Sequence, residues 1–306
     1  MVLTITLNPS IDISLQIRQL VPEDKLRCEQ YEKEVGGGGI NVAKGLARLG
    51  LDAQAAFFTA GLNGKWIKEK LHENNLIKIT VDSQGETREN ISIHDLLTHE
   101  QYRLVNKGDG VTKKNQNDLM TRIMMVHPQP TYVIISGSMP SGMNATFMTK
   151  LNAWCKLIHA RLVIDMPADD LIKCFRYTPF LIKPNLKEFL RIAGKKSLTQ
   201  TELISEGKSW ISKKYASNIA ISMGEQGGIL INEREAVALK PPRAKVLSTV
   251  GAGDSMVAGM IYQFYHEATF KDILKLGLAC GTAATLQQGT KLFEPEVAWS
   301  LYKKIV

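Results

Sequence analysis

The stretch Thr249-Val250-Gly251-Ala252-Gly253-Asp254-Ser255 sets two glycines around an alanine and a carboxylate directly after them. The apolar run MVAGMIY follows at residues 256–262, with the composition of a helix. The pattern predicts a tight glycine turn that delivers Asp254 to the first turn of a helix. Free N–H groups at a helix N-terminus favour negative charge. A base beside such an anion site suits transfer of a phosphoryl group to a hydroxyl. The alternative is that Asp254 only caps the helix.

The length and composition are those of a soluble α/β protein. The 306 residues suffice for one large domain with an appendage or for two small domains. No apolar run is long enough to span a bilayer, and the N-terminus has no basic leader, so we expect neither a membrane segment nor a signal peptide. The four cysteines are widely spaced, which predicts reduced thiols in a cytoplasmic protein. They are Cys28, Cys155, Cys174 and Cys280.

The formal net charge is +8, and the lysines and arginines are spread along the chain without a long basic block. No nucleic-acid-binding motif accompanies this charge, so we expect no nucleic-acid partner. A basic surface can attract small anionic substrates. It can equally be no more than a solvated surface.

Apolar strands and helices alternate along most of the chain. Short apolar runs at residues 132–135, 162–164, 180–182 and 219–222 each precede or follow a helix-like segment. This alternation predicts an α/β fold, a three-layer α/β/α sandwich with a mainly parallel sheet. Residues 13–34 and 79–105 are more polar and alternate in character, which predicts a small outer β-sheet inserted as a lid. We expect residues 1–306 to form a single domain that carries this lid.

Common nucleotide, metal and hydrolase motifs are missing from the sequence. It has no Gly-x-x-x-x-Gly-Lys-Ser/Thr, and the glycine run at Gly36 does not continue as Gly-x-Gly-x-x-Gly. No His/Cys cluster has the spacing of a zinc site, and no Gly-x-Ser-x-Gly supports a serine hydrolase. Any nucleotide site must therefore be of another type.

The N-terminal third contains two candidates for binding a hydroxylated ligand. The run Gly36–Gly39 before a helix-like segment lets a ligand approach the backbone, and Asn41 can hydrogen-bond a hydroxyl. The alternative is a loop that needs unusual φ/ψ angles to pass close to a strand. Asp12 follows a strand end, where ligand-binding residues occur in open α/β sheets. It can also be a turn-stabilising aspartate.

Two candidates for a nucleotide site follow apolar strands later in the chain. Asn185 and Glu188 lie after Lys183-Pro184 and share one helix face, where they can hold a magnesium ion, mostly through waters. A capping box fits the same spacing. Residues 222–228 (SMGEQGG) form a glycine turn that can cradle phosphates or adenosine, or simply connect two strands.

Four basic residues fall on the expected lid: Lys25, Arg27, Arg88 and Arg103. Strand alternation can turn several of them toward one face, where arginine grips a phosphate bidentately. The alternative is that these charges keep a sheet edge soluble.

In order along the chain, these motifs resemble the PfkB (ribokinase-like) family of carbohydrate kinases. The resemblance covers nearly the whole chain and is closest to its phosphosugar branch, above all to the ribokinase-type 6-phosphofructokinases. The segments that carry it are Asn8–Asp12, Lys25–Cys28, Gly36–Asn41, Thr87–Asn90, Ser136–Ser138, Lys183–Asn185 with Glu188, Ser222–Gly224, Gly251–Val257, Gly281–Leu286 and Gln288–Thr290.

The resemblance has departures that bear on specificity. Gly38 stands where 1-phosphofructokinases and tagatose-6-phosphate kinases usually carry a lysine, which favours a 6-phosphofructokinase. Residues 139–142 (MPSG) replace a usual Leu-Pro-x-Gly, and residues 165–168 (DMPA) replace a usual Asp-Ser/Thr-Ser-Gly. Gln287 replaces an asparagine near a monovalent-cation loop. A 1-phosphofructokinase, a tagatose-6-phosphate kinase and a non-catalytic sugar-phosphate sensor therefore stay open.

The resemblance implies a reaction, a set of roles and a partner. The γ-phosphoryl group of MgATP would pass to the primary hydroxyl of fructose 6-phosphate, with Asp254 as the base, an effect of K⁺ and a homodimer that shares its lids. The Gly251, Ala252 and Gly253 amides would hold the transferred group. Asp12, Lys25, Arg27, Gly37, Gly38, Asn41, Arg88 and Ser138 would bind the sugar phosphate, and Lys183, Asn185, Ser222, Gly224 and Gly227 would bind ATP, with Asn185 and Glu188 on magnesium.

Overall fold

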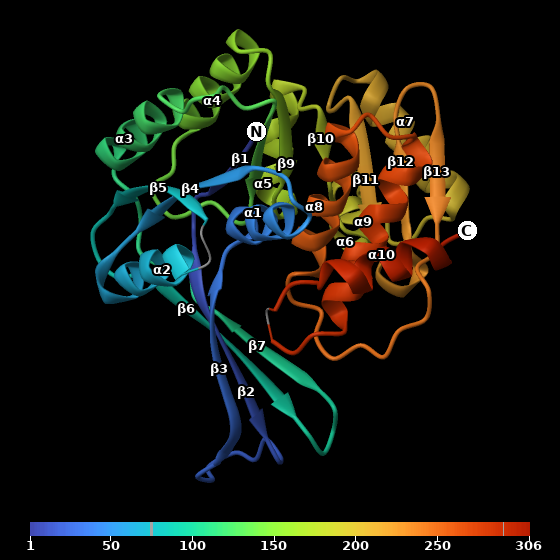
Figure 1. The fold of residues 1–306 in the computed structure, drawn as a ribbon. Helices are drawn as coiled ribbons and strands as arrows, with labels where there is room; N and C mark the ends of the chain where they lie inside the picture. Colours follow the sequence, from blue (N-terminus) through green and yellow to red (C-terminus); the bar gives the residue numbers. More distant parts are fainter. Residues whose placement is uncertain (74–75, 290) are drawn as a thin grey trace.

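The computed structural model describes residues 1–73, 76–289 and 291–306. Its body is a nine-stranded sheet between two layers of helices, and a four-stranded sheet projects from the body as a lid (Figure 1). The expected α/β/α sandwich with a small lid is therefore confirmed. In spatial order the nine strands are β13 (Ala236–Leu239), β12 (Gly228–Ile231), β11 (Asn218–Ser222), β10 (Leu181–Ile182), β9 (Arg161–Asp165), β8 (Tyr132–Ser136), β1 (Val2–Thr6), β4 (Ala53–Thr59) and β5 (Ile77–Asp82).

The central strands are apolar throughout because helices cover both faces of the sheet. Pairings from β5 to β11 are all parallel, and only β12 and β13 add antiparallel strands at one edge. Successive side chains enter opposite cores: Val2 packs in one cluster and Leu3 in the other. A strand buried on both faces has no polar side, so continuous apolar runs are its sequence signature.

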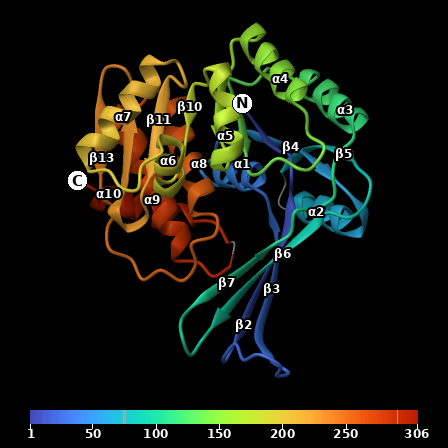
Figure 2. The ribbon, with the colours of Figure 1, turned by 180° about the vertical axis from the view of Figure 1, so that it is seen from behind.

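The helices form two layers, seen from the front in Figure 1 and from behind in Figure 2. None of the described helices has both the length and the apolar character needed to cross a bilayer. One layer contains α1 (Gly38–Arg48), α2 (Gly61–Glu73), α8 (Ala252–Tyr265), α9 (Phe270–Thr285) and α10 (Pro295–Lys304). The other contains α3 (Lys113–Met124), α4 (Ala145–Leu157), α5 (Ala168–Cys174), α6 (Leu186–Ala193) and α7 (Gln200–Ser212), and two short 3₁₀ turns are η1 (Phe175–Tyr177) and η2 (Gly224–Gln226).

The lid sheet has the order β3 (Cys28–Gly36), β2 (Ser10–Ile17), β6 (Arg88–Asp95), β7 (Gln101–Val105). The expectation that residues 79–82 belong to this sheet is wrong. They lie in β5, which pairs in parallel with β4 at the edge of the main sheet. The sequence misled because an edge strand is half exposed and alternates in character, as a lid strand does.

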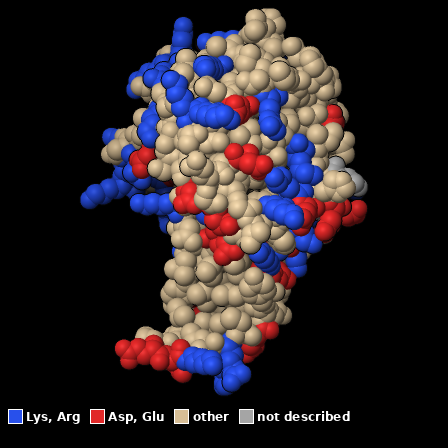
Figure 3. Space-filling view, turned by 90° about the vertical axis from the view of Figure 1, so that its left-hand side faces the viewer, with Lys and Arg blue, Asp and Glu red and all other residues tan. Residues whose placement is uncertain are grey.

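The lid has one apolar face and one polar face. The pairing places Ile13 beside Ile91, and Ile91 beside Leu104. Leu104 is 58% exposed and Tyr31 60%, so much of this apolar face is open to solvent. In Figure 3 the narrow lower part of the molecule carries few charged side chains above a charged tip. An exposed apolar face of this kind is typical of a surface that contacts a partner.

The first turn of α1 lies against strand β1, and this contact requires glycine. A Cβ atom at Gly39 would lie 2.6 Å from the Ile5 carbonyl oxygen and 2.6 Å from Thr6 Oγ1. Gly37 has a φ of 121°, which only glycine adopts readily. The glycine run therefore brings the N-terminus of α1 up to the carboxyl ends of the sheet strands.

Replacing Gly39 with alanine should lower the free energy of unfolding by about 1–3 kcal/mol, because the backbone must shift to admit a methyl group. This loss should exceed the gain in helix propensity, which is about 1 kcal/mol. Denaturant titration measures it. Ala47→Ser on the exposed side of α1 is the control and should change stability by less than about 0.5 kcal/mol. Equal stability of Gly39→Ala and the unmodified protein would contradict the close contact.

Candidate active site

The candidate residues meet where the parallel strands end. Ser136 closes β8, Asp165 closes β9, and Lys183 follows β10 directly. The N-termini of α1 and α8 face the same edge, because Asn41 in α1 bonds to Asp254 in α8. Ligands bind at the carboxyl ends of strands in open α/β sheets.

Asp254 is a largely buried carboxylate in the first turn of α8, with part of the residue still accessible. The helix begins after Gly251, whose φ of 77° is left-handed, and no side chain caps it. Asp254 Oδ2 instead accepts a hydrogen bond from Asn41 Nδ2 at 2.9 Å, and Oδ1 accepts one from Ser136 Oγ at 3.4 Å. The interpretation of Asp254 as a helix cap is therefore wrong.

The pKa of Asp254 is raised to about 7. Burial is the main cause, and the negative charge of Asp165 adds to it. The hydrogen bond from Asn41 and the positive charge of Lys183 act in the opposite direction. A carboxyl with a pKa near neutrality exchanges protons readily at physiological pH, as a general base must.

The glycine run at the start of α1 lies near Asp254. A Cβ atom at Gly38 would lie 2.2 Å from Ser136 Oγ, so the start of α1 contacts the end of β8 directly. The alternative interpretation of the run, a loop that needs unusual backbone angles and passes close to strands, agrees with the φ of 121° at Gly37 and the close contacts at Gly38 and Gly39; binding of a ligand by this backbone stays a prediction. Asn41 Oδ1 is buried and has no hydrogen-bond partner within the described residues, which leaves an acceptor beside Asp254.

Asp12 and Arg88 lie at the base of the lid. Asp12 Oδ1 accepts hydrogen bonds from Ser10 Oγ at 2.8 Å and from Asn90 Nδ2 at 2.9 Å. These bonds join β2 to β6 and fix the carboxylate at the edge of the site. The sequence indicated no separate role for Asn90, which is only the last residue of the motif Thr87–Asn90. Its contact spans 78 residues, so only its pairing in the sheet reveals its role.

Arg88 is braced by backbone carbonyl groups. Its NH2 and NH1 groups donate to Asn8 O at 2.9 Å and Asn106 O at 2.8 Å. Its Nε is buried and has no partner among the described residues. Ser138 lies nearby and accepts a hydrogen bond from Asn8 Nδ2 at 3.3 Å.

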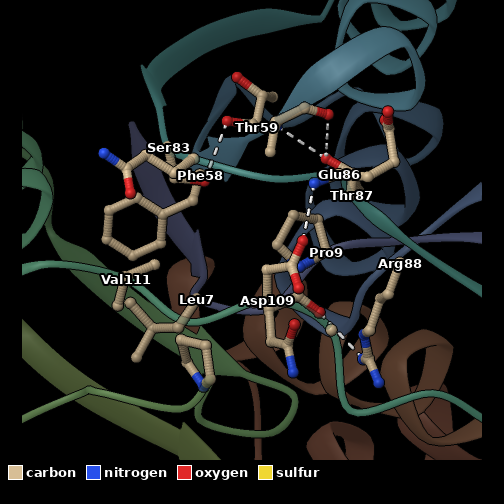
Figure 4. A pocket seen from close by; sticks show the side chains of 15 residues that line it. Leu7, Pro9, Phe58, Thr59, Ser83, Glu86, Thr87, Arg88, Asp109 and Val111 are labelled. Carbon is tan, nitrogen blue, oxygen red and sulfur yellow. Dashed lines mark hydrogen bonds between the residues drawn. The ribbon is translucent and has the colours of Figure 1, made fainter.

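A small pocket adjoins Arg88, and Figure 4 shows its lining side chains. Asp109 Oδ2 accepts from Glu86 N at 2.8 Å, and Glu86 Oε1 accepts from Asn63 N at 2.7 Å. These bonds tie the segments before and after β6 and β7 to the start of α2. The network therefore holds the Arg88 end of the lid on the body.

Lys183 and Asp165 form a buried ion pair. Lys183 is 5% exposed, and its Nζ lies 3.0 Å from Asp165 Oδ1. Burial alone would lower the pKa of Lys183, but Asp165 and Asp254 outweigh burial and raise it. A Cβ atom at Gly253 would lie 3.3 Å from Lys183 Nζ, so the cation adjoins the N-terminus of α8. Sequence reasoning gave Asp165 no role, and its position directly after a buried strand was the only signal.

Asn185 and Glu188 form a capping box at the start of α6. Asn185 N donates to Glu188 Oε2 at 2.8 Å, and Glu188 N donates to Asn185 Oδ1 at 2.9 Å. The capping alternative is therefore correct, and it leaves the other carboxylate oxygen of Glu188 for a ligand. Burial raises the pKa of Glu188. In the described chain no three His, Cys, Asp or Glu side chains gather as a metal site. The oxygen donors of Asn185 and Glu188 fit a magnesium ion that keeps waters and phosphates as its other ligands.

The glycine turn after β11 lies beside Asn185. Ser222 N donates to Pro184 O at 3.1 Å. Gly224 has a φ of 59° and open space where a Cβ would lie. At Gly227 a Cβ would lie 2.0 Å from Leu239 O. The turn connects β11 to β12, as the alternative interpretation expected, and packing against β13 explains Gly227.

Other expected residues lie away from this cluster. Lys25 and Arg27 are exposed in the turn between β2 and β3, at the far end of the lid from Asp12 (Figure 1). Arg103 is exposed in β7, where it pairs with Ser92. Within one described chain, the structure does not bring Lys25 and Arg27 to Asp254. Thr290, part of the quoted motif 288–290, lies outside the described residues.

A larger cavity of about 630 Å³ separates the polar face of the lid from the body. Its lining includes Ser14, Glu32 and His94 of the lid and residues 245–247 and 288–289 of the body. The lid contacts the body across it, because Lys291 Nζ lies 2.8 Å from Glu32 Oε1.

Residues 5–297 match the family described as pfkB family carbohydrate kinase. The chain belongs to the PfkB family. It is therefore an ATP-dependent phosphotransferase. It is 31% identical to the ATP-dependent 6-phosphofructokinase isozyme 2 of Escherichia coli K12, over 98% of this chain and 97% of that one. It is 28% identical to the 1-phosphofructokinase of Bacillus subtilis 168, over 96% of each.

The PfkB fold agrees with a solved structure. The crystal structure of phosphofructokinase-2 from Escherichia coli in complex with substrates and products superposes with a TM-score of 0.93 at 30% identity. The match covers 99% of this chain and 98% of that one. The nine-stranded body and the lid are thus those of a PfkB kinase.

The raised pKa of Asp254 predicts how its replacement changes stability with pH. Between the usual value of 3.8 and about 7, the folded state binds the proton that the unfolded state has lost. The free energy of unfolding therefore falls as pH rises through this range, by up to about 4 kcal/mol. Asp254→Asn removes that penalty, so the variant should be more stable than the unmodified protein at pH 8.

Denaturant titrations at pH 4.5 and pH 8 test this expectation, and the advantage of the variant should shrink to about 1 kcal/mol at the lower pH. Asp118→Asn, in an exposed ion pair with Lys114, is the control and should change stability by less than about 1 kcal/mol. A pH-independent difference between Asp254→Asn and the unmodified protein would show that Asp254 does not titrate near neutrality.

Proposed function

We propose that this ATP-dependent sugar-phosphate kinase transfers the γ-phosphoryl group of ATP to the primary hydroxyl of fructose 6-phosphate and yields fructose 1,6-bisphosphate. The observation that carries the proposal is the buried Asp254 at the N-terminus of α8, with a pKa of about 7 and Lys183 nearby. A base and a cation so close together suit the transfer of a phosphoryl group between them. The relatives named above support a phosphorylated ketohexose as the acceptor.

Asp254 accepts the proton of the attacking hydroxyl, which breaks the O–H bond as the new O–P bond forms. Asn41 holds the carboxylate by its bond to Oδ2, so one oxygen is fixed relative to the acceptor. The Gly251, Ala252 and Gly253 amides precede the first regular α8 bond, from Ser255 N to Gly251 O, and Ala252 N makes only a long bond of 3.5 Å to Thr249 O. They can therefore stabilise charge on the transferred group.

The sugar phosphate binds between the lid and α1. Asn41 Oδ1 and Arg88 Nε are buried without partners in the described chain, and a bound hydroxyl and phosphate would satisfy them. Asp12 and the Gly37 and Gly38 backbone hold further hydroxyls, with Ser138 at the substrate end. Gly38 also supports the choice of substrate, because 1-phosphofructokinases and tagatose-6-phosphate kinases usually carry a lysine at this position.

ATP binds across the carboxyl ends of β10 and β11. Lys183 pairs with its phosphates, and Ser222, Gly224 and Gly227 shape the turn beside them. Magnesium, when bound, offsets the charge of the phosphates, and Asn185 and Glu188 orient its waters. We also propose that K⁺ affects the activity through the loop that contains Gln287.

A coupled ADP-release assay on a panel of sugars and sugar phosphates tests the substrate. We expect kcat/KM to be highest for fructose 6-phosphate, ahead of fructose 1-phosphate and tagatose 6-phosphate. Asp254→Asn should lower kcat by about 10²–10⁴-fold, the range for a general base, with KM changed little. A higher kcat/KM for either isomer would reassign the enzyme to that substrate, and absence of turnover with every sugar would favour a sensor.

We further propose that two chains pair through the apolar faces of their lids. Pairing would bury Leu104 and Tyr31, which are exposed in one chain, and would bring Lys25 and Arg27 to the site of the second subunit.

Leu104→Asp should then convert a dimer to a monomer in gel filtration at micromolar concentration and raise the KM for the sugar phosphate. Leu62→Asp, at an exposed apolar residue of α2 (80% exposed), is the control. A monomeric unmodified protein would contradict the pairing.

A further inference from the structure

Asp254, Ser136, Asp165 and Lys183 form a continuous buried chain of polar groups. Ser136 Oγ lies 3.4 Å from Asp254 Oδ1 and 3.3 Å from Asp165 Oδ2. The other oxygen of Asp165 lies 3.0 Å from Lys183 Nζ. Three neighbouring strand ends and α8 supply these groups, so the fold brings together residues that are up to 118 positions apart.

The hydroxyl of Ser136 carries one proton, and this limits the hydrogen bonding of the two carboxylates. When both are ionised, Ser136 can donate to only one of them, and the other faces an oxygen lone pair. When Asp254 is protonated on Oδ1, it donates to Ser136 Oγ while Ser136 donates to Asp165. The chain is then complete, so the bridge favours one proton shared by two carboxylates.

The two carboxylates have different partners. Lys183 adjoins Asp165 at 3.0 Å, and Asn41 binds Asp254 from the other side at 2.9 Å. An ammonium in contact stabilises an ionised carboxylate more than a neutral amide donor does. The charged groups that act on Asp254 are Asp165 and Lys183 on this side and Asp12 at the base of the lid.

We propose that Asp165 is a positioning residue for the base: paired with Lys183, it acts on Asp254 directly and through Ser136 and favours residence of the substrate proton on Asp254. During transfer the sugar O–H bond breaks, the O–P bond forms, the bond from the γ-phosphorus to ADP breaks, and the proton moves to Asp254. Ser136 and Asp165 then accept the resulting chain of hydrogen bonds without gaining a net proton. This inference rests on the proposed role of Asp254 as the base.

The pH dependence of kcat tests the inference, in its acid limb, where kcat falls as Asp254 takes up a proton. Asp165→Asn should move this limb to lower pH by about one unit, because Asp254 loses a neighbouring negative charge. Ser136→Ala keeps both charges and removes the bridge, so its limb should move in the same direction by less. The substrates titrate identically in every variant, so the difference between variants reports the protein. Asp169→Asn, in an exposed ion pair with Arg191, is the control and should leave the limb in place.

A second measurement covers the case in which Asp165→Asn folds poorly because Lys183 loses its partner. The double variant Asp165→Asn with Lys183→Met removes both charges and leaves no unpaired ion. In free protein labelled with [¹³C]aspartate, the carboxyl signal that is lost in Asp254→Asn identifies Asp254. Its titration midpoint should fall in the double variant, since Asp165 is the stronger of the two influences on Asp254.

The outcomes separate this inference from the proposed function. If the variants are active and neither the acid limb of kcat nor the titration midpoint of Asp254 moves, the role of Asp165 is overturned. The kinase assignment is then left intact. A lowered kcat or a raised KM for ATP at an unchanged limb would show that Asp165 only holds Lys183, which also overturns the inference. Lack of turnover by the unmodified protein would refute the substrate, while the midpoint of Asp254 would still test the coupling.

Discussion

The structure depends on holding an acidic side chain, Asp254, out of water at the edge of the sheet. A lone buried carboxylate is unfavourable, and two kinds of group relieve the penalty. The amide of Asn41 donates a hydrogen bond, and Lys183 brings a positive charge that Asp165 partly neutralises. The relief is incomplete, since the pKa stays near 7. Incomplete compensation is what leaves the group able to take and release a proton at physiological pH.

The glycines place these groups at the correct distances. At Gly38 and Gly39 the backbone of α1 contacts β8 and β1 so closely that a methyl group would collide. This approach brings Asn41 within hydrogen-bonding distance of Asp254. At Gly251 a left-handed φ turns the chain into α8. These glycines therefore fix the packing at the edge of the sheet, and the proposed binding of substrate by the same backbone is compatible with that role.

Local patterns predicted much of this arrangement, and contacts between distant residues supplied the rest. The apolar runs predicted the parallel sheet because burial on both faces removes any polar side. The glycine turn predicted the place of Asp254 because backbone angles are a local property. The strand β5 was misassigned because an edge strand and a lid strand share one pattern. Asp165 and Asn90 were missed because their partners lie far along the chain. The Asn185–Glu188 spacing fits both a helix-capping box and a magnesium site. The same side-chain oxygens serve in either case, so the sequence alone could not distinguish the two.

The lid and the buried carboxylate are two parts of one requirement. A base with a pKa near 7 must be kept from water, since water would solvate its charge and return the pKa toward 3.8. The body of a single chain excludes water on the side of α1, α8 and β8, but a cavity of about 630 Å³ separates the polar face of the lid from the body. The lid strands place polar side chains on that cavity and apolar side chains on the opposite face. Covering the apolar face would hold the polar face over the substrates. In the proposed mechanism, covering the apolar face and excluding water from the substrates beside Asp254 would both depend on the position of the lid.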